Sequence, residues 1–282
     1  MQGEPAIGIE LFVNRDMVTP DVHVVAGGTV AVQSKRSPDK QATGSNEREN
    51  EDGALIIQLG DSRGVLAVAD GLGGQPEGGR AAGMALRALG AAIETANPKP
   101  DDLRELILNG FEIANRAIRD LEIGAGTTLA VAEIDGRSIR TYHAGDSMIL
   151  VVGQQGKLKL QTVSHSPVGY AVEAGLLEED EAMHHEDRHL VSNIVGSAQM
   201  RIEVGPVLDL SSRDTLLLAT DGLFDNLRVE EIVALIRKGG LEKASQDLVA
   251  LCDDRMRKTK HGMPSKPDDL TMVAFRPRTR SP

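Results

Sequence analysis

The residues best suited to chemistry are aspartates at the ends of short apolar segments. Five of them precede or follow runs of aliphatic residues that we expect to form buried strands: Asp52, Asp70, Asp146, Asp221 and Asp268. An aspartate beside a buried strand loses solvent and needs a counter-charge to stay ionised. No comparable set of Lys or Arg accompanies these strands. A divalent cation would supply the charge, and carboxylate ligands favour hard ions, Mg2+ or Mn2+.

Glycines follow two of these aspartates. Asp70 begins the sequence Asp-Gly-Leu-Gly-Gly, and Asp221 begins Asp-Gly-Leu-Phe-Asp. Glycine lets backbone carbonyls approach an ion closely because it has no side chain. A single Asp-Gly pair is more typical of an ordinary turn. The shared position at strand ends is therefore what indicates a metal site.

The elements that must position these residues are short strands alternating with helices. Apolar runs and turn residues predict strands at 54–59, 65–69, 127–134, 138–144, 148–152, 157–163, 215–219 and 270–275. Helical patterns lie at 80–95, 102–121, 229–237 and 241–258. Polar residues predict a loop at 34–51, and the charged segment 164–197 is expected to form a surface flap. Hairpins and paired helices indicate an α+β fold, and no linker divides it, so we expect one domain over residues 1–282.

Composition excludes several classes of protein. The net charge of -11 argues against a nucleic-acid partner, because phosphate backbones attract Lys and Arg. The single cysteine, Cys252, cannot form an intramolecular disulfide, and its amphipathic setting indicates a buried thiol. The sequence shows no apolar run of the roughly 20 residues that span a bilayer and no signal-peptide pattern. We expect a cytoplasmic monomer that binds neither nucleic acid nor membrane.

The order of the motifs resembles the type 2C, or PPM, metal-dependent serine/threonine protein phosphatase family, in its bacterial-like branch. Six segments carry the resemblance: 50–52, 70–74 with Gly78, 126–128, 145–147, 221–225 and 268–271. The matching core extends over residues 46–276, nearly the whole chain. The resemblance implies a sandwich of two antiparallel sheets flanked by helix pairs, in α-β-β-α layers, with a metal site at one end.

The resemblance also implies a ligand set and a reaction. Six residues would hold two or three Mn2+ or Mg2+ ions: Asp52, Asp70, Gly71, Asp146, Asp221 and Asp268. Asp70 would bridge two ions, and Glu51 with Asp52 would position bound waters. Water activated by the ions would hydrolyse phosphoserine or phosphothreonine in a protein substrate, opposing a serine/threonine kinase.

Three positions depart from the family pattern. Glu47 stands where the family usually has a phosphate-binding Arg, which leaves Arg48 and Arg36 as alternative candidates for that role. At a position where many family members have a His, this chain has Leu72, so we expect water to protonate the leaving group. Met148 replaces another usual Arg, which we interpret as a structural difference.

Other interpretations rest on weaker patterns. The segment 60–64 fits G-x-S-x-G around Ser62, but an apolar strand follows it where a serine-hydrolase elbow requires a helix. His184, His185 and His189 could suggest zinc, yet their surroundings are polar and favour a solvated flap. Two alternatives to a protein phosphatase stay open: a catalytically weak binding or regulatory module on this fold, and a phosphatase for small phosphate esters.

Overall fold

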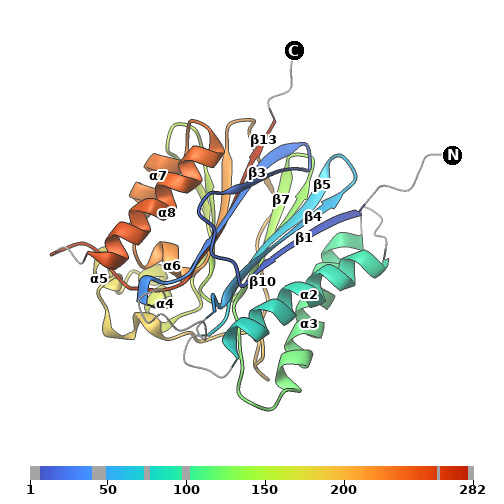
Figure 1. Ribbon diagram of the computed structural model, residues 1–282, viewed down its shortest axis with the longest axis horizontal. Helices are drawn as coiled ribbons and strands as arrows, with labels where there is room; N and C mark the ends of the chain where they lie inside the picture. The colour runs from blue at the N-terminus through green and yellow to red at the C-terminus, as the bar shows by residue number, and fades with distance from the viewer. Residues whose placement is uncertain (1–6, 40–48, 73–76, 97–101, 259–260, 279–282) are drawn as a thin grey trace.

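The computed structural model describes residues 7–39, 49–72, 77–96, 102–258 and 261–278. Two antiparallel sheets dominate this part of the chain (Figure 1). The first sheet has the order β1-β4-β5-β6-β7-β10, and β11 also pairs with β7. Its strands are β1 (Ile7–Val13), β4 (Asp52–Leu59), β5 (Arg63–Asp70), β6 (Leu129–Asp135), β7 (Ser138–Ala144), β10 (Glu203–Val204) and β11 (Leu208–Asp209).

The second sheet has the order β2-β3-β13-β12-β8-β9. Its strands are β2 (Asp21–Val25), β3 (Gly28–Lys35), β8 (Met148–Val152), β9 (Leu158–Gln161), β12 (Thr215–Ala219) and β13 (Leu270–Pro277). Tight turns set the register of the hairpins in the first sheet. The β6–β7 turn, for example, contains Asp135-Gly136 with Gly136 at a φ of 61°, a conformation that glycine adopts without strain.

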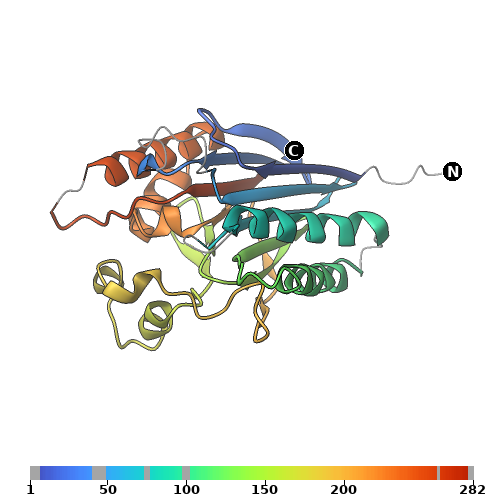
Figure 2. The ribbon, with the colours of Figure 1, turned by 60° about the horizontal axis from the view of Figure 1, so that its bottom comes forward.

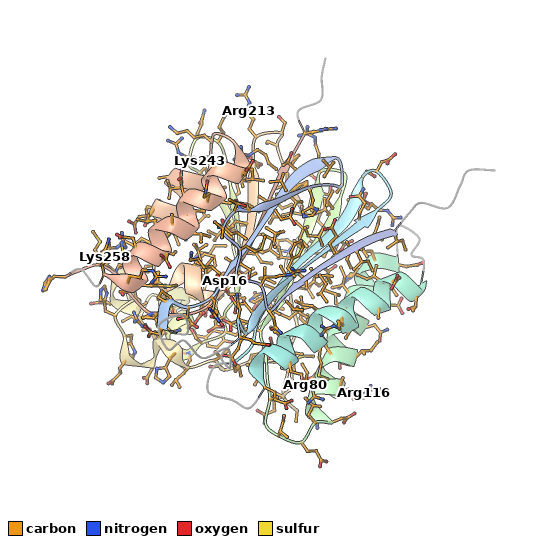
Figure 3. The ribbon with its side chains drawn as sticks, in the orientation of Figure 1. Asp16, Arg80, Arg116, Arg213, Lys243 and Lys258 are labelled. Atoms are coloured by element: carbon orange, nitrogen blue, oxygen red, sulfur yellow. The ribbon has the colours of Figure 1, made fainter. Side chains whose placement is uncertain are left out.

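Helices cover the outer faces of both sheets. On the first sheet lie α2 (Gly78–Ala96) and α3 (Leu103–Arg119), and on the second lie α7 (Val229–Ile236) and α8 (Leu241–Arg257) (Figure 1). Charged side chains such as Arg116 and Lys243 project outward from these helices (Figure 3). The shorter α4 (Pro167–Glu173), α5 (Glu179–Ala182), η2 (Glu186–His189) and α6 (Asp221–Phe224) lie near one end of the sandwich (Figure 2).

Three apolar layers hold these elements together. One lies between the first sheet and α2 with α3, and contains Ile107 and Phe111. A second lies between the two sheets, and a third lies under α7 and α8. Aliphatic side chains form most of each layer, as the low aromatic content requires. The predicted α+β sandwich with α-β-β-α layers is confirmed.

The structure corrects some predicted elements. The strands β1 to β3 were not predicted, and because β3 ends at Lys35 the polar loop begins after 35 rather than at 34. The flap 164–197, predicted to be irregular, contains α4, α5 and η2. Within the described ranges, no helix is both long and apolar enough to cross a membrane.

Candidate metal centre

Antiparallel pairing brings Asp52 and Asp70 together. Asp52 is the first residue of β4 and Asp70 the last residue of β5, and the two are direct partners in the ladder. Side chains of directly paired residues lie on the same face of a sheet. Thr220 Oγ1 donates a hydrogen bond to Asp52 Oδ2 at 2.8 Å, which joins this pair to the end of β12 in the second sheet. The two sheets therefore meet at these aspartates.

The register of the second sheet adds three more carboxylates. The last residue of β12, Ala219, pairs with Met272 of β13 and with Met148 of β8. Asp221 follows β12, Asp268 precedes β13 and Asp146 precedes β8. All three aspartates therefore lie at the same end of the sheet, facing the Asp52–Asp70 pair.

The Gly-Thr-Thr motif at 126–128 holds the backbone around Asp70. Thr127 Oγ1 donates to the Asp70 carbonyl at 2.7 Å, and the Asp70 N–H donates to Thr128 Oγ1 at 3.0 Å. Thr128 Oγ1 also lies 2.6 Å from the Ser147 hydroxyl, next to Asp146. The motif is thus structural, because it fixes two parts of the carboxylate cluster relative to each other.

Close backbone packing explains two of the glycines. A Cβ on Gly71 would lie 2.2 Å from the Gly78 carbonyl, and a Cβ on Gly222 would lie 1.9 Å from the Asp269 carbonyl. Real Cβ atoms do not approach backbone this closely, so only glycine fits either position. The Gly71 N–H donates to the Glu51 carbonyl at 3.2 Å, and the Glu51 N–H donates to Asp269 Oδ2 at 2.8 Å. Glu51 and Gly71 therefore lie beside the cluster.

Burial and mutual repulsion shift the protonation of these carboxyl groups. Burial raises the pKa of Asp70 well above its usual range, and the charges of Asp52 and Asp221 raise it further. Burial also raises the pKa of Asp146 to about 8, with added repulsion from Asp221. The pKa of Asp268 rises to about 7 for the same two reasons. The site therefore favours added positive charge.

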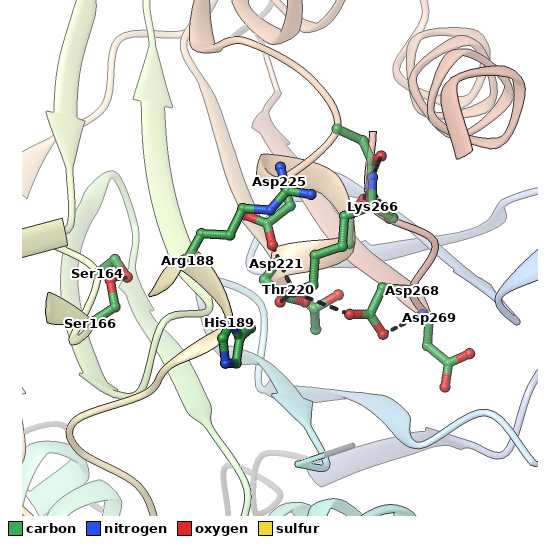
Figure 4. Close-up of polar contacts among 12 residues, drawn as sticks. Ser164, Ser166, Arg188, His189, Thr220, Asp221, Asp225, Lys266, Asp268 and Asp269 are labelled. Carbon is green, nitrogen blue, oxygen red and sulfur yellow. Dashed lines mark hydrogen bonds and ion pairs between the residues drawn. The ribbon is translucent and has the colours of Figure 1, made fainter. Parts of the chain in front are cut away.

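Lys266 lies inside this cluster, where the sequence predicted no set of Lys or Arg comparable to the aspartates. Its Nζ lies 2.5 Å from Asp221 Oδ2, 2.7 Å from Asp225 Oδ2 and 3.3 Å from Asp268 Oδ2 (Figure 4). Burial alone would raise the pKa of Asp221, but the charge and hydrogen bond of Lys266, together with hydrogen bonds from Asp70 and the Gly222 backbone, lower it. One lysine against this many aspartates leaves the cluster with an excess of negative charge.

The oxygen ligands at this site suit a hard divalent cation. Among the residues that the structure describes, Asp52 Oδ1 and Asp221 Oδ1 are buried and accept no hydrogen bond. A buried carboxylate oxygen without a donor is costly, and a cation is the usual compensation. Carboxylate and backbone carbonyl oxygens are the ligands that Mg2+ and Mn2+ prefer.

A histidine pair lies behind Asp146 and supports its loop. The rings of His143 and His165 stack with centroids 4.3 Å apart. His165 Nδ1 accepts hydrogen bonds from the Gly145 N–H at 3.1 Å and from the Asn193 amide at 2.9 Å. Its Nε2 therefore carries the proton and donates to Glu203 Oε2 at 3.1 Å. Ligand atoms of these two histidines and Glu203 lie within 4.8 Å of one another, but the hydrogen bonds already occupy both His165 nitrogens.

Of the two arginines predicted to bind phosphate, the structure describes only Arg36. Arg36 follows β3, is partly buried and lines the same small recess as Asp268. Arg48 lies outside the described residues. Asp225, Lys266 and Asp269 are the residues of this site that the sequence analysis did not assign. Asp225 was visible as the last residue of the motif 221–225, and Asp269 was visible beside Asp268.

The weaker sequence patterns do not form sites in the described structure. Ser62 is exposed in the turn between β4 and β5, so a strand follows it and the serine-hydrolase interpretation is wrong. His184 and His189 bond to backbone carbonyls of Asp180 and Glu186 within the flap, and they do not converge on a common point with a third ligand.

A cavity of about 590 Å3 opens beside the carboxylate cluster. Asp146, Asp221 and Asp225 line one side of it, and flap residues including Val168 and Arg188 line the other. Figure 4 shows Arg188 extending from the flap toward Asp225. The cavity can therefore admit part of a polypeptide next to the site where cations would bind.

Comparison with known proteins agrees with this geometry. A family model described as protein phosphatase 2C matches residues 42–257. Protein phosphatase PhpP of Streptococcus pneumoniae is 34% identical over 178 residues, which are 60% of this chain and 71% of PhpP. The structure of the S. agalactiae serine/threonine phosphatase is 27% identical with a TM-score of 0.72, and the match covers 88% of this chain and 98% of that one.

The fold also matches the catalytic domain of the serine/threonine protein phosphatase PstP, solved in complex with two manganese ions. That match has a TM-score of 0.66 at 24% identity and covers 89% of this chain and 98% of the PstP chain. The family model covers most of the present chain, and the aspartates of its motifs gather at one end of the sandwich. The chain therefore belongs to the protein phosphatase 2C family and is a protein serine/threonine phosphatase.

Proposed function

We propose that this protein hydrolyses phosphoserine and phosphothreonine in proteins with the help of two or three Mn2+ or Mg2+ ions held by its aspartates. The observation that carries the proposal is the meeting of five strand-end aspartates at one point, with two buried carboxylate oxygens that accept no hydrogen bond in the described structure. When bound, such ions stabilise charge on the phosphoryl oxygens and lower the pKa of water.

The residues of this chain divide the work by position. Asp70, Asp221 and Asp268 would hold the cations, since they come from both sheets and face one another. Asp52 would position a water, because one of its oxygens is fixed by Thr220 and the other is left without a donor among the described groups. The Gly71 carbonyl would serve as a further ligand, and Asp146 would contribute to a third, weaker position.

The substrate would enter through the 590 Å3 cavity. Its wall beside the flap combines apolar residues, such as Val168 and Val172, with polar ones such as Ser166, so a polypeptide chain can pack there while its phosphate reaches the carboxylate end. Arg36, which lies next to Asp268, or Arg48 would bind the phosphate, because a guanidinium donates paired hydrogen bonds to phosphate oxygens.

A cysteine mechanism has no support. Cys252 is buried in the layer under α8, and burial raises the pKa of its thiol above the usual range. A thiol in that state is neither ionised nor reachable by a phosphopeptide. We also infer that the enzyme reverses the action of a serine/threonine kinase and acts as a monomer, which light scattering of the purified protein would test.

The decisive assay compares phosphoserine and phosphothreonine peptides with a small aryl phosphate, each with Mn2+, with Mg2+ and with EDTA. The proposal predicts peptide turnover with either metal and none in EDTA. Asp70→Asn should abolish turnover, whereas the control Asp135→Asn, in an exposed turn at the other end of β6, should not. Peptide binding without turnover would favour the regulatory-module alternative, and turnover of the aryl phosphate alone would favour a small-ester phosphatase.

A further inference from the structure

The ammonium of Lys266 is held by three carboxylates. Its distances to Asp221, Asp225 and Asp268 are 2.5, 2.7 and 3.3 Å, and the side chain is 20% exposed (Figure 4). A lysine ammonium has three N–H donors, so each can point to one carboxylate. Lys266 therefore sits among these oxygens in the way that a small cation would.

The backbone of Lys266 is fixed by Asn226, which is fully buried. Asn226 Oδ1 accepts a hydrogen bond from the Lys266 N–H at 2.8 Å, and Asn226 Nδ2 donates to the Lys266 carbonyl at 2.9 Å. The same Nδ2 donates to the Gly222 carbonyl at 2.9 Å, one residue after Asp221. The loop that carries Lys266 is thus attached to the helix that carries Asp221, and this attachment places the lysine side chain at the cluster.

Two of the three carboxylates are the ones assigned above to cation binding. An ammonium and a divalent cation repel each other, so a cation that binds Asp221 and Asp268 competes with Lys266 for these two carboxylates. Because Asn226 fixes the backbone, the side chain is the part of Lys266 that can move away from these two carboxylates. Asp225, which was not assigned as a ligand, can keep the ammonium after it leaves the other two.

We propose that Lys266 is an internal competitor for the cation position between Asp221 and Asp268, so that metal loading exchanges the ammonium for a divalent ion. This inference rests on the proposed function for the assignment of those two ligands. It implies that the lysine supplies charge to the metal-free site and weakens metal binding there. Loading of the enzyme then needs a higher concentration of Mn2+ or Mg2+ than the aspartates alone would require.

The test is a calorimetric Mn2+ titration of the full chain and of Lys266→Met, which keeps the length of the side chain and removes its charge. The matched control is Lys258→Met. Lys258 pairs with Asp254 at 2.6 Å, but it is exposed at the end of α8, away from the cluster (Figure 3). We expect Lys266→Met to bind Mn2+ about tenfold more tightly than wild type, within the usual range of coupling between two bound groups, and Lys258→Met to bind like wild type.

Equal or weaker Mn2+ binding by Lys266→Met would overturn the proposal, because the lysine would then support the ligands instead of competing with the ion. If the metal-free variant does not fold, chelator titration of the Mn2+-loaded proteins gives the same comparison, and Lys266→Met should need more chelator to lose its metal. Phosphopeptide turnover at saturating Mn2+ separates the two claims. Tighter binding without turnover in any form would refute the proposed function alone, and turnover with unchanged affinity would refute the role of Lys266 alone.

Discussion

Replacing Asp146 by asparagine tests whether the site's carboxylates destabilise the metal-free fold. Asp146 is buried between β7 and β8, and burial together with the charges of Asp221 and Asp225 raises its pKa to about 8. In the unfolded chain an aspartate has a pKa of about 3.9. Between these two values the folded protein binds a proton that the unfolded chain has lost, so stability falls as pH rises through this window.

The size of the effect follows from the shift. At about pH 7 the folded protein keeps Asp146 protonated at a cost of about 1.4 kcal/mol per unit above 3.9, or about 4 kcal/mol as an upper estimate. Structural relaxation and water reduce such penalties, so we take half of the upper estimate, about 2 kcal/mol, as the expected destabilisation. Asparagine cannot ionise and avoids the cost. For a domain of this size the gain corresponds to a rise in Tm of about 4–8 °C.

The assay is a set of melting curves in EDTA for wild type, Asp146→Asn and the control Asp135→Asn, from about pH 4 to about pH 8. The difference in Tm between Asp146→Asn and wild type should be near zero at the acid end and grow steadily toward the alkaline end. Asp135→Asn should follow wild type throughout, since Asp135 is exposed in a turn that asparagine also suits. A difference that does not change with pH, or a variant that melts below wild type, would contradict the raised pKa of Asp146 in the folded protein.

Three further predictions concern activity. Asp70→Asn should lower kcat/KM at saturating Mn2+ by at least about 100-fold, because it removes a charge that orders the cations. Ser62→Ala should leave initial rates unchanged. The opposite pattern would restore the serine-hydrolase interpretation. Cys252→Ala should keep full phosphopeptide turnover, and mass spectrometry should show alkylation of the wild-type thiol only after unfolding; rapid labelling of the native protein would contradict its burial. Arg36→Ala or Arg48→Ala should raise KM for phosphopeptides more than it changes the calorimetric Mn2+ affinity, and unchanged kinetics in both variants would remove arginine from phosphate binding.

The positions of the clustered aspartates could be predicted because each belongs to a local pattern. A run of aliphatic residues that ends in Asp70 or Asp221 indicates a strand and its end without knowledge of the fold. Antiparallel pairing then brings such ends together, and the register of Asp52 with Asp70 confirms it. The layer order could be predicted from the family resemblance, since hairpins alone do not show which sheet a strand joins.

Lys266 could not be predicted in the same way, because its contacts depend on how a loop closes. One residue separates it from Asp268 in the sequence, but its position follows from hydrogen bonds to Asn226, forty residues earlier. The N-terminal strands were missed for a related reason. β3 becomes a central strand only through its pairing with β13, more than 200 residues later. Contacts between residues so far apart in the chain leave little pattern in the local sequence.

The most direct test of the account is anomalous diffraction at the manganese edge from crystals of the protein grown with Mn2+. The proposed metal centre predicts strong anomalous peaks in contact with Asp70, Asp221 and Asp268, with the Gly71 carbonyl among the ligands and Lys266 displaced from Asp221. An absence of peaks at these aspartates, or a single peak at the cluster of His143, His165 and Glu203, would contradict the proposed metal centre.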